Sequence, residues 1–139
     1  MLLSRMKNSL IFVVDKNPIH RNMVRFYLES KKWSNVESFP SGEECLYRLK
    51  RAPHPDFIIT SFFTGNHSGF DLLKNIHHLA ASARVVFFDT FEDHNLPEKL
   101  LEAGACDCIL KTQTPEAGIS ELLKNIDFLA REKALFNVQ

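Results

Sequence analysis

The feature that most constrains the fold of this chain is a regular alternation of short apolar runs with amphipathic stretches. The apolar runs cover residues 10–14, 35–39, 56–60, 84–88 and 106–110. Each run has the length and composition of a strand rather than of a helix. Amphipathic stretches with helical spacing follow at residues 18–31, 41–51, 68–78, 97–103 and from residue 115. Five strands alternating with five helices predict a doubly wound α/β fold, with a parallel sheet and helices on both faces.

Residues at the ends of the amphipathic stretches support this assignment. Asn17 can cap a helix that has Pro18 in its first turn. Ser41 and Glu44 have the spacing of a capping box. Gly104 follows the stretch at 97–103, where glycine typically ends a helix.

Length and composition indicate one domain. The chain has 139 residues, 45% of them hydrophobic, and 17 basic residues balance 17 acidic ones. We expect a domain at residues 10–130, an N-terminal extension at 1–9, and the end of the last helix with a tail at 131–139. The balanced charge gives no indication of nucleic-acid binding, and no apolar run could form a signal peptide or a membrane span. We therefore expect a soluble, cytoplasmic protein.

Cys106 and Cys108 are residues of the type that binds zinc. They share one face of the predicted fifth strand. Zinc normally needs two further ligands, so we interpret both as buried small residues.

Polar residues follow four of the predicted strands. In parallel α/β sheets, ligands bind outside the carboxyl ends of the strands, so a functional site is expected there. The residues concerned are Asp15 and Lys16 after the first strand, Ser61 after the third, Asp89 and Thr90 after the fourth, and Lys111 after the fifth.

From about residue 10 to residue 130 the chain resembles the receiver domain of two-component response regulators. The matching pieces are VVDKNP at 13–18, SGEECL at 41–46, PDFIIT at 55–60, GFDLLKNI at 69–76 and AGACDCILK at 103–111. The resemblance implies a flavodoxin-like sheet with strand order 2-1-3-4-5. It also implies a phosphorylation switch, in which an acidic pair holds a divalent metal and an Asp after the third strand accepts the phosphoryl group.

The residues of this chain depart from that pattern. Asp15 keeps the first acid, Lys16 replaces the second, and Ser61 stands at the phosphoacceptor position. Asp89 stands where the family has a hydroxyl residue, unless the fourth strand runs one residue longer and Thr90 takes that place. Lys111 is kept.

Two further departures lie on and after the fifth strand. Cys108 replaces the usual aromatic residue, and Thr112 replaces the Pro that usually follows the lysine. In the family this Lys–Pro bond is commonly cis. Because a cis bond before Thr would cost about 2.5–4 kcal/mol, we expect Lys111–Thr112 to be trans.

These departures remove the chemistry of the switch. A serine hydroxyl needs a base before it can attack a phosphoryl donor, and the only nearby candidate is His67 in the following loop. Mg²⁺ needs carboxylate ligands, whereas the formal charges of the four charged pocket residues sum to zero. These residues are Asp15, Lys16, Asp89 and Lys111. We therefore expect no catalytic residue, no cofactor, and weak or absent Mg²⁺ binding. In this hypothesis a lysine ammonium takes the place of the metal, and Asp89 pairs with Lys111 or Lys16.

The leading prediction is a degenerate receiver, or pseudo-receiver, that is not an enzyme. It would bind a signalling partner, or a second copy of itself, independently of phosphorylation. The expected surface is built from the helix after the fourth strand, the fifth strand and the last helix. Apolar residues near the end of that helix indicate either a partner contact or a fraying tail: Phe128, Leu129, Leu135 and Phe136.

Two alternatives remain open. One is a small enzyme or ligand-binding protein on the same fold, such as a flavin binder. It would need a phosphate-cradling loop after the first strand, but residues 15–18 contain no Gly and carry an acid. The other alternative is a receiver that is phosphorylated at a non-standard residue.

Overall fold

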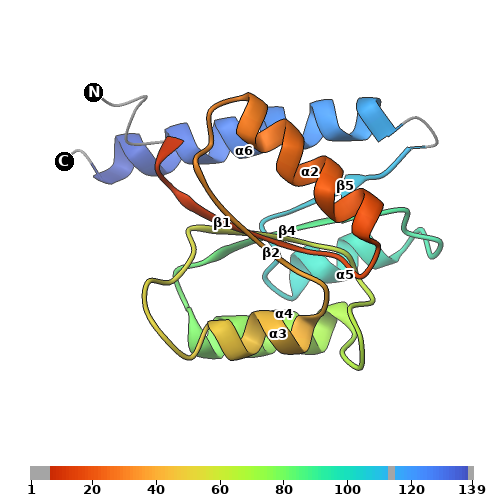
Figure 1. The fold of residues 1–139 in the computed structure, drawn as a ribbon. Coiled ribbons are helices and arrows are strands. Elements are labelled where there is room, and N and C mark those ends of the chain that lie inside the picture. The colour runs from red at the N-terminus through yellow and green to blue at the C-terminus, as the bar shows by residue number, and fades with distance from the viewer. Residues whose placement is uncertain (1–6, 113–114, 138–139) are drawn as a thin grey trace.

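The computed structural model describes residues 7–112 and 115–137, and it contains one five-stranded parallel sheet (Figure 1). The strand order β2-β1-β3-β4-β5 confirms the predicted topology. The strands are β1 (Leu10–Val14), β2 (Asn35–Phe39), β3 (Phe57–Thr60), β4 (Arg84–Asp89) and β5 (Asp107–Leu110). The helices, labelled as in Figure 1, are α2 (Pro18–Ser30), α3 (Gly42–Arg48), α4 (Gly69–Leu79), α5 (Leu96–Glu102) and α6 (Pro115–Asn137).

The helices form one layer on each side of the sheet. Figure 1 shows α2 and α6 over one face and α3, α4 and α5 over the other. Because side chains alternate along a strand, β1 contributes to both cores. Ile11 and Val13 pack in the cluster that contains residues of α2 and α6. Phe12 and Val14 pack in the cluster on the opposite face.

The predicted helix starts are found in the structure. The Asn17 side-chain oxygen accepts hydrogen bonds from the backbone N–H of Ile19 at 2.9 Å and of His20 at 3.3 Å. The Ser41 hydroxyl accepts from the backbone N–H of Glu44 at 3.2 Å. Both contacts satisfy amides that have no partner within the first turn of a helix.

The predicted ends of the elements differ from the structure by up to three residues. The largest difference is at α3, which ends at Arg48 rather than at residue 51. The Arg48 guanidinium is buried and donates to the backbone carbonyls of Arg51 and Pro53 at 2.9 and 3.0 Å. These bonds hold residues 49–53 in a turn, so the helix does not continue.

The interpretation of Cys106 and Cys108 as buried residues is wrong. Cys106 precedes β5 and is exposed, and Cys108 is half-buried, with its thiol donating to the carbonyl of Pro97 at 3.7 Å. Since β5 is an edge strand, only one of its two sides is covered by a neighbouring strand.

Two further expectations concern the backbone and the membrane. The described part of the chain has one cis peptide bond, Ala52–Pro53, so Lys111–Thr112 is trans as predicted. None of the helices within residues 7–112 and 115–137 combines the length and apolarity needed to cross a bilayer.

Candidate functional site

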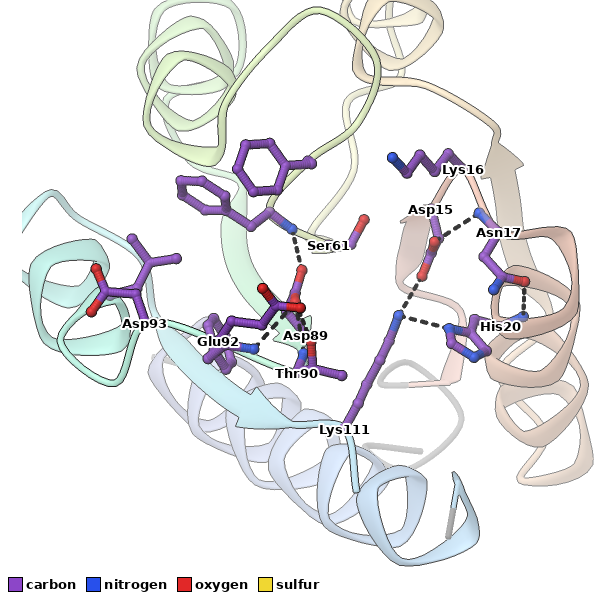
Figure 2. Close-up of a pocket in the computed structure, with 14 residues that line it drawn as sticks. Asp15, Lys16, Asn17, His20, Ser61, Asp89, Thr90, Glu92, Asp93 and Lys111 are labelled. Carbon is purple, nitrogen blue, oxygen red and sulfur yellow. Dashed lines mark hydrogen bonds and ion pairs between the residues drawn. The ribbon is translucent and has the colours of Figure 1, made fainter. Parts of the chain in front are cut away.

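A cavity of about 510 Å³ lies at the carboxyl ends of β1, β3, β4 and β5 (Figure 2). The structure brings together all six residues that the sequence placed at this edge. They are Asp15, Lys16, Ser61, Asp89, Thr90 and Lys111. Apolar side chains from the loops after β3 and β4 complete the lining, among them Phe62, Phe63 and Phe91.

An ion pair between Asp15 and Lys111 closes one side of the cavity. The ammonium of Lys111 lies 2.7 Å from the Asp15 carboxylate, and the two side chains are only 12% and 10% exposed. The other carboxylate oxygen of Asp15 accepts from the backbone N–H of Asn17 at 2.9 Å. Both oxygens of this acid therefore have donors within the chain, as Figure 2 shows.

His20 is a member of the site that sequence reasoning missed. Its Nδ1 lies 3.1 Å from the ammonium of Lys111, which also contacts Asp15 (Figure 2). A lysine ammonium can only donate, so Nδ1 is the acceptor in this contact. Its place in the sequence could have indicated this role. His20 lies in the first turn of α2, directly after the loop that carries Asp15.

Asp89 holds two loops through hydrogen bonds. One carboxylate oxygen accepts from the backbone N–H of Phe62 at 2.7 Å. The other accepts from the backbone N–H groups of Thr90 and Phe91, at 2.7 and 3.3 Å, and from the Thr90 hydroxyl at 3.3 Å. Asp89 thereby ties the loop after β3 to the loop after β4.

The prediction that Asp89 pairs with Lys111 or Lys16 is wrong. Asp89 is the last residue of β4, where the amides of the two loops satisfy its carboxylate. Lys111 is engaged by Asp15 instead. Lys16 is exposed and makes no ion pair within the described residues.

Ser61 directly follows β3, and its side chain is almost completely buried. The residue is 7% exposed, and its hydroxyl has no hydrogen-bond partner among the described residues. His67, the candidate base, does not line the cavity. Its ring lies 3.9 Å from the carboxylate of Glu43 instead. Among the described residues, neither His67 nor any other base forms a hydrogen bond with the Ser61 hydroxyl.

The residues present do not fit a divalent cation. One Asp15 oxygen already contacts an ammonium, and the neighbouring position is the lysine Lys16. Within the described ranges, no three His, Cys, Asp or Glu side chains are grouped as metal ligands would be. Mg²⁺ requires several hard oxygen ligands around one point. Asp15, Asp89, Glu92 and Asp93 all line the cavity, but among the described residues they are not grouped as such a ligand set.

A groove of about 690 Å³ adjoins the cavity, between the start of α5 and β5. Its apolar walls are formed by Phe91, Pro97, Cys108 and Leu110. Burial, followed by the nearby charge of Asp107, raises the pKa of the Cys108 thiol to about 11. The groove therefore presents a protonated, weakly polar thiol and apolar walls to its contents.

Comparison with known protein families identifies the kind of domain to which this site belongs. The sequence model of the response regulator receiver domain matches residues 11–123. The chain therefore belongs to this family. The expected family and fold are confirmed, and the chain is a receiver domain of the two-component type, a class of signalling module.

Relatives of this receiver domain include regulators from bacteria and plants. The transcriptional activator protein ExaE of Pseudomonas putida is 28% identical over 106 residues, which cover 76% of this chain and 49% of ExaE. The two-component response regulator ORR7 of Oryza sativa subsp. japonica is 29% identical over 115 residues, or 81% of this chain and 53% of ORR7. The receiver domain spans about half the length of these two relatives.

Solved structures show the same fold. The receiver domain of Francisella response regulator 1452 superimposes with a TM-score of 0.77 at 17% identity, covering 91% of this chain and 99% of that one. The response regulator domain of Thermotoga maritima CheB gives a TM-score of 0.75 at 26% identity, covering 89% and 96%.

Proposed function

We propose that this receiver domain is a pseudo-receiver, which acts by binding a signalling protein independently of phosphorylation. The observation that carries the proposal is Ser61, which stands directly after β3 with a buried hydroxyl that has no hydrogen-bond partner among the described residues. A carboxylate at this place would be anionic at neutral pH and ready to attack a phosphoryl donor. A neutral hydroxyl without a base is a much weaker nucleophile.

The charge distribution supports the same proposal. The Asp15–Lys111 ion pair neutralises the acid that would otherwise face a metal ion. We infer that the ammonium replaces the metal electrostatically, so Mg²⁺ binds weakly or not at all. Asp89 is fully engaged in holding the two loops together. The edge of the sheet is thereby stabilised in one state rather than poised between two.

The partner surface that we propose is formed by α5, β5 and α6. The apolar groove lies here, and Leu101 and Leu110 are 45% and 50% exposed on the same side of the sheet. Cys108 leaves room beside Pro97 that a larger side chain would fill. An apolar side chain of a partner protein suits this groove.

A flavin-binding function has no support in the loop after β1. The backbone N–H groups of Ile19 and His20, at the start of α2, already bond to the Asn17 side chain. A phosphate group would need these amides free. Phosphorylation at a non-standard residue is the remaining alternative. The experiment described next tests this alternative as well as the proposal.

The experiment is intact-mass measurement after incubation with Mg²⁺ and a small acyl phosphate. It compares the wild type with Ser61→Asp, with Lys16→Asp/Ser61→Asp, and with the control Ser61→Ala. We expect no gain in mass for the wild type or the control, and one phosphoryl group on the double variant, in which the acidic pair and the acceptor are restored. A phosphoryl group on the wild type would refute the proposal, and mapping would then identify the residue.

A further inference from the structure

Helix α6 has a second apolar stripe on the side that faces away from the core. The helix is 23 residues long, and its inner side buries Ile119, Leu122 and Ile126. Phe128 and Leu135 are 63% and 62% exposed. They are seven residues apart, so they lie on the same side of the helix, two turns from each other.

Charged residues flank this stripe, with basic residues on one side and acidic residues on the other. At about 100° per residue, Lys124 and Arg131 lie roughly 30–50° to one side of the stripe, and Glu121 and Glu132 lie equally far to the other side. All four residues are exposed. We call the six residues the outer face of α6: Glu121, Lys124, Phe128, Arg131, Glu132 and Leu135. This face has an apolar centre, one basic edge and one acidic edge.

The charged edges remain available to a partner. Arg131 contacts Asp127 at 2.8 Å, and Glu132 lies 3.9 Å from Arg84. Such exposed ion pairs contribute only about 0–1 kcal/mol, so their rearrangement costs little.

We propose that the outer face of α6 pairs with the same face of a second copy of this chain, with the two helices parallel. A two-fold axis along the helices places the basic edge of one copy beside the acidic edge of the other. An antiparallel pair would instead place basic beside basic and acidic beside acidic. Charge complementarity therefore favours a second copy of this chain as the partner, with the two α6 helices parallel.

The heights of the charges along the helix agree with a parallel pair. Arg131 and Glu132 differ by one residue, or about 1.5 Å of rise. Lys124 and Glu121 differ by three residues, or about 4.5 Å. Both pairs are thus within reach across the interface. In the same arrangement, Phe128 packs against Phe128 of the second copy, and Leu135 packs against Leu135.

The apolar centre is small, so we expect a weak and reversible dimer. The inference deepens the proposed function, in which binding is the output, by naming one partner. It does not depend on the chemistry at Ser61. Dimerisation and phosphorylation are measured separately, so failure of either proposal can be recognised without the other.

The first test is sedimentation velocity from low micromolar to near-millimolar concentration. We expect a concentration-dependent dimer for the wild type and a monomer for Phe128→Ser/Leu135→Ser. The matched control is Ile19→Ser/Phe26→Ser on the outer side of α2, where the two residues are 69% and 64% exposed. The control should dimerise like the wild type. A monomeric wild type at every concentration, or equal loss in the control, would overturn the proposal.

The second test determines the direction of pairing. Phe128→Cys and Leu135→Cys are made separately in a Cys106→Ser background and oxidised. A parallel pair forms a symmetric disulfide at both positions, whereas an antiparallel pair does so at one position at most. Lys124→Glu/Arg131→Glu and Glu121→Lys/Glu132→Lys should each be monomeric alone and dimerise when mixed. Failure of the mixture to dimerise would contradict the charge argument.

Discussion

The ammonium of Lys111 lies 2.7 Å from the carboxylate of Asp15, and this contact connects β5 to β1 across the ends of the two strands between them. Both side chains are about nine-tenths buried. A buried charge without its partner is costly, so each residue depends on the other. The ion pair is therefore expected to stabilise the fold of this domain, in addition to neutralising the Asp15 charge in the pocket.

Removing Lys111 should destabilise the domain. We expect Lys111→Ala to lower the free energy of unfolding by about 2–4 kcal/mol, because Asp15 would remain buried without a cation. The control Lys16→Ala, on an exposed neighbour, should change it by less than about 0.5 kcal/mol. Urea denaturation measures both. Equal effects in the two variants would show that the ion pair does not stabilise the fold.

Removing the Asp89 carboxylate should loosen the two loops that it joins. In Asp89→Ala the backbone N–H groups of Phe62 and Phe91 lose their acceptor, which should cost about 1–3 kcal/mol. Amide hydrogen exchange should become faster at these two residues and stay unchanged in the core of β1. Asp93→Ala is the control, since the one hydrogen bond of its carboxylate within the described part of the chain is to the backbone N–H of Asn95 in an exposed turn. Unchanged protection at Phe62 would contradict the assigned role.

The sequence was sufficient for the sheet and for six of the residues that line the pocket. The buried strands read as short apolar runs, and parallel topology brings their carboxyl ends to one edge whatever the loops do. This placed Asp15, Ser61, Asp89 and Lys111 together without knowledge of their contacts. The Asn17 cap was equally visible, because it depends on residues only two and three positions away.

The pairing inside the pocket could not be predicted from the sequence. Asp89 has backbone amides nearer than any ammonium, and loop amides carry no sequence signal. His20 joins Lys111 across 91 residues of chain, which depends on the direction of a side chain at the start of α2. The exposure of Cys106 depends on where β5 begins, and strand ends are poorly specified by apolar runs.

The three cysteines should react at different rates with a thiol reagent at about pH 8. Burial raises the pKa of the Cys45 thiol to about 12, and that of Cys108 to about 11. Only the thiolate reacts, so the exposed Cys106 should be modified first and Cys45 only after unfolding. Raising the pH toward 10 should speed the reaction of Cys108. Intact mass with peptide mapping follows the order, and early modification of Cys45 would refute it.

Gly65 in the loop after β3 should not tolerate a side chain. Its φ is +86°, and an added Cβ would collide with the carboxylate of Glu43. We expect Gly65→Ala to reduce the free energy of unfolding by about 1–3 kcal/mol, because both the backbone conformation and the space favour glycine. Gly104→Ala is the comparison: its φ is +110°, and an added Cβ would lie 2.8 Å from the His77 ring, so both positions combine backbone strain with a side chain that must move. Unchanged stability in both variants would contradict this explanation.

Glu43 should make this loop sensitive to acid. Its carboxylate accepts from the backbone N–H of Asn66 at 2.8 Å, and this bond, with a smaller contribution from His67, lowers the Glu43 pKa. A lowered pKa in the folded state stabilises the fold above the usual Glu pKa of about 4.3 and ceases to do so as the pH falls through the lowered value. Glu43→Gln should therefore be less stable than the wild type at neutral pH, and the difference should disappear in acid, once the pH has fallen below the lowered pKa. Denaturation series at both pH values measure it, with Glu44→Gln as the control. A difference that persists in acid would assign the effect to packing rather than to charge.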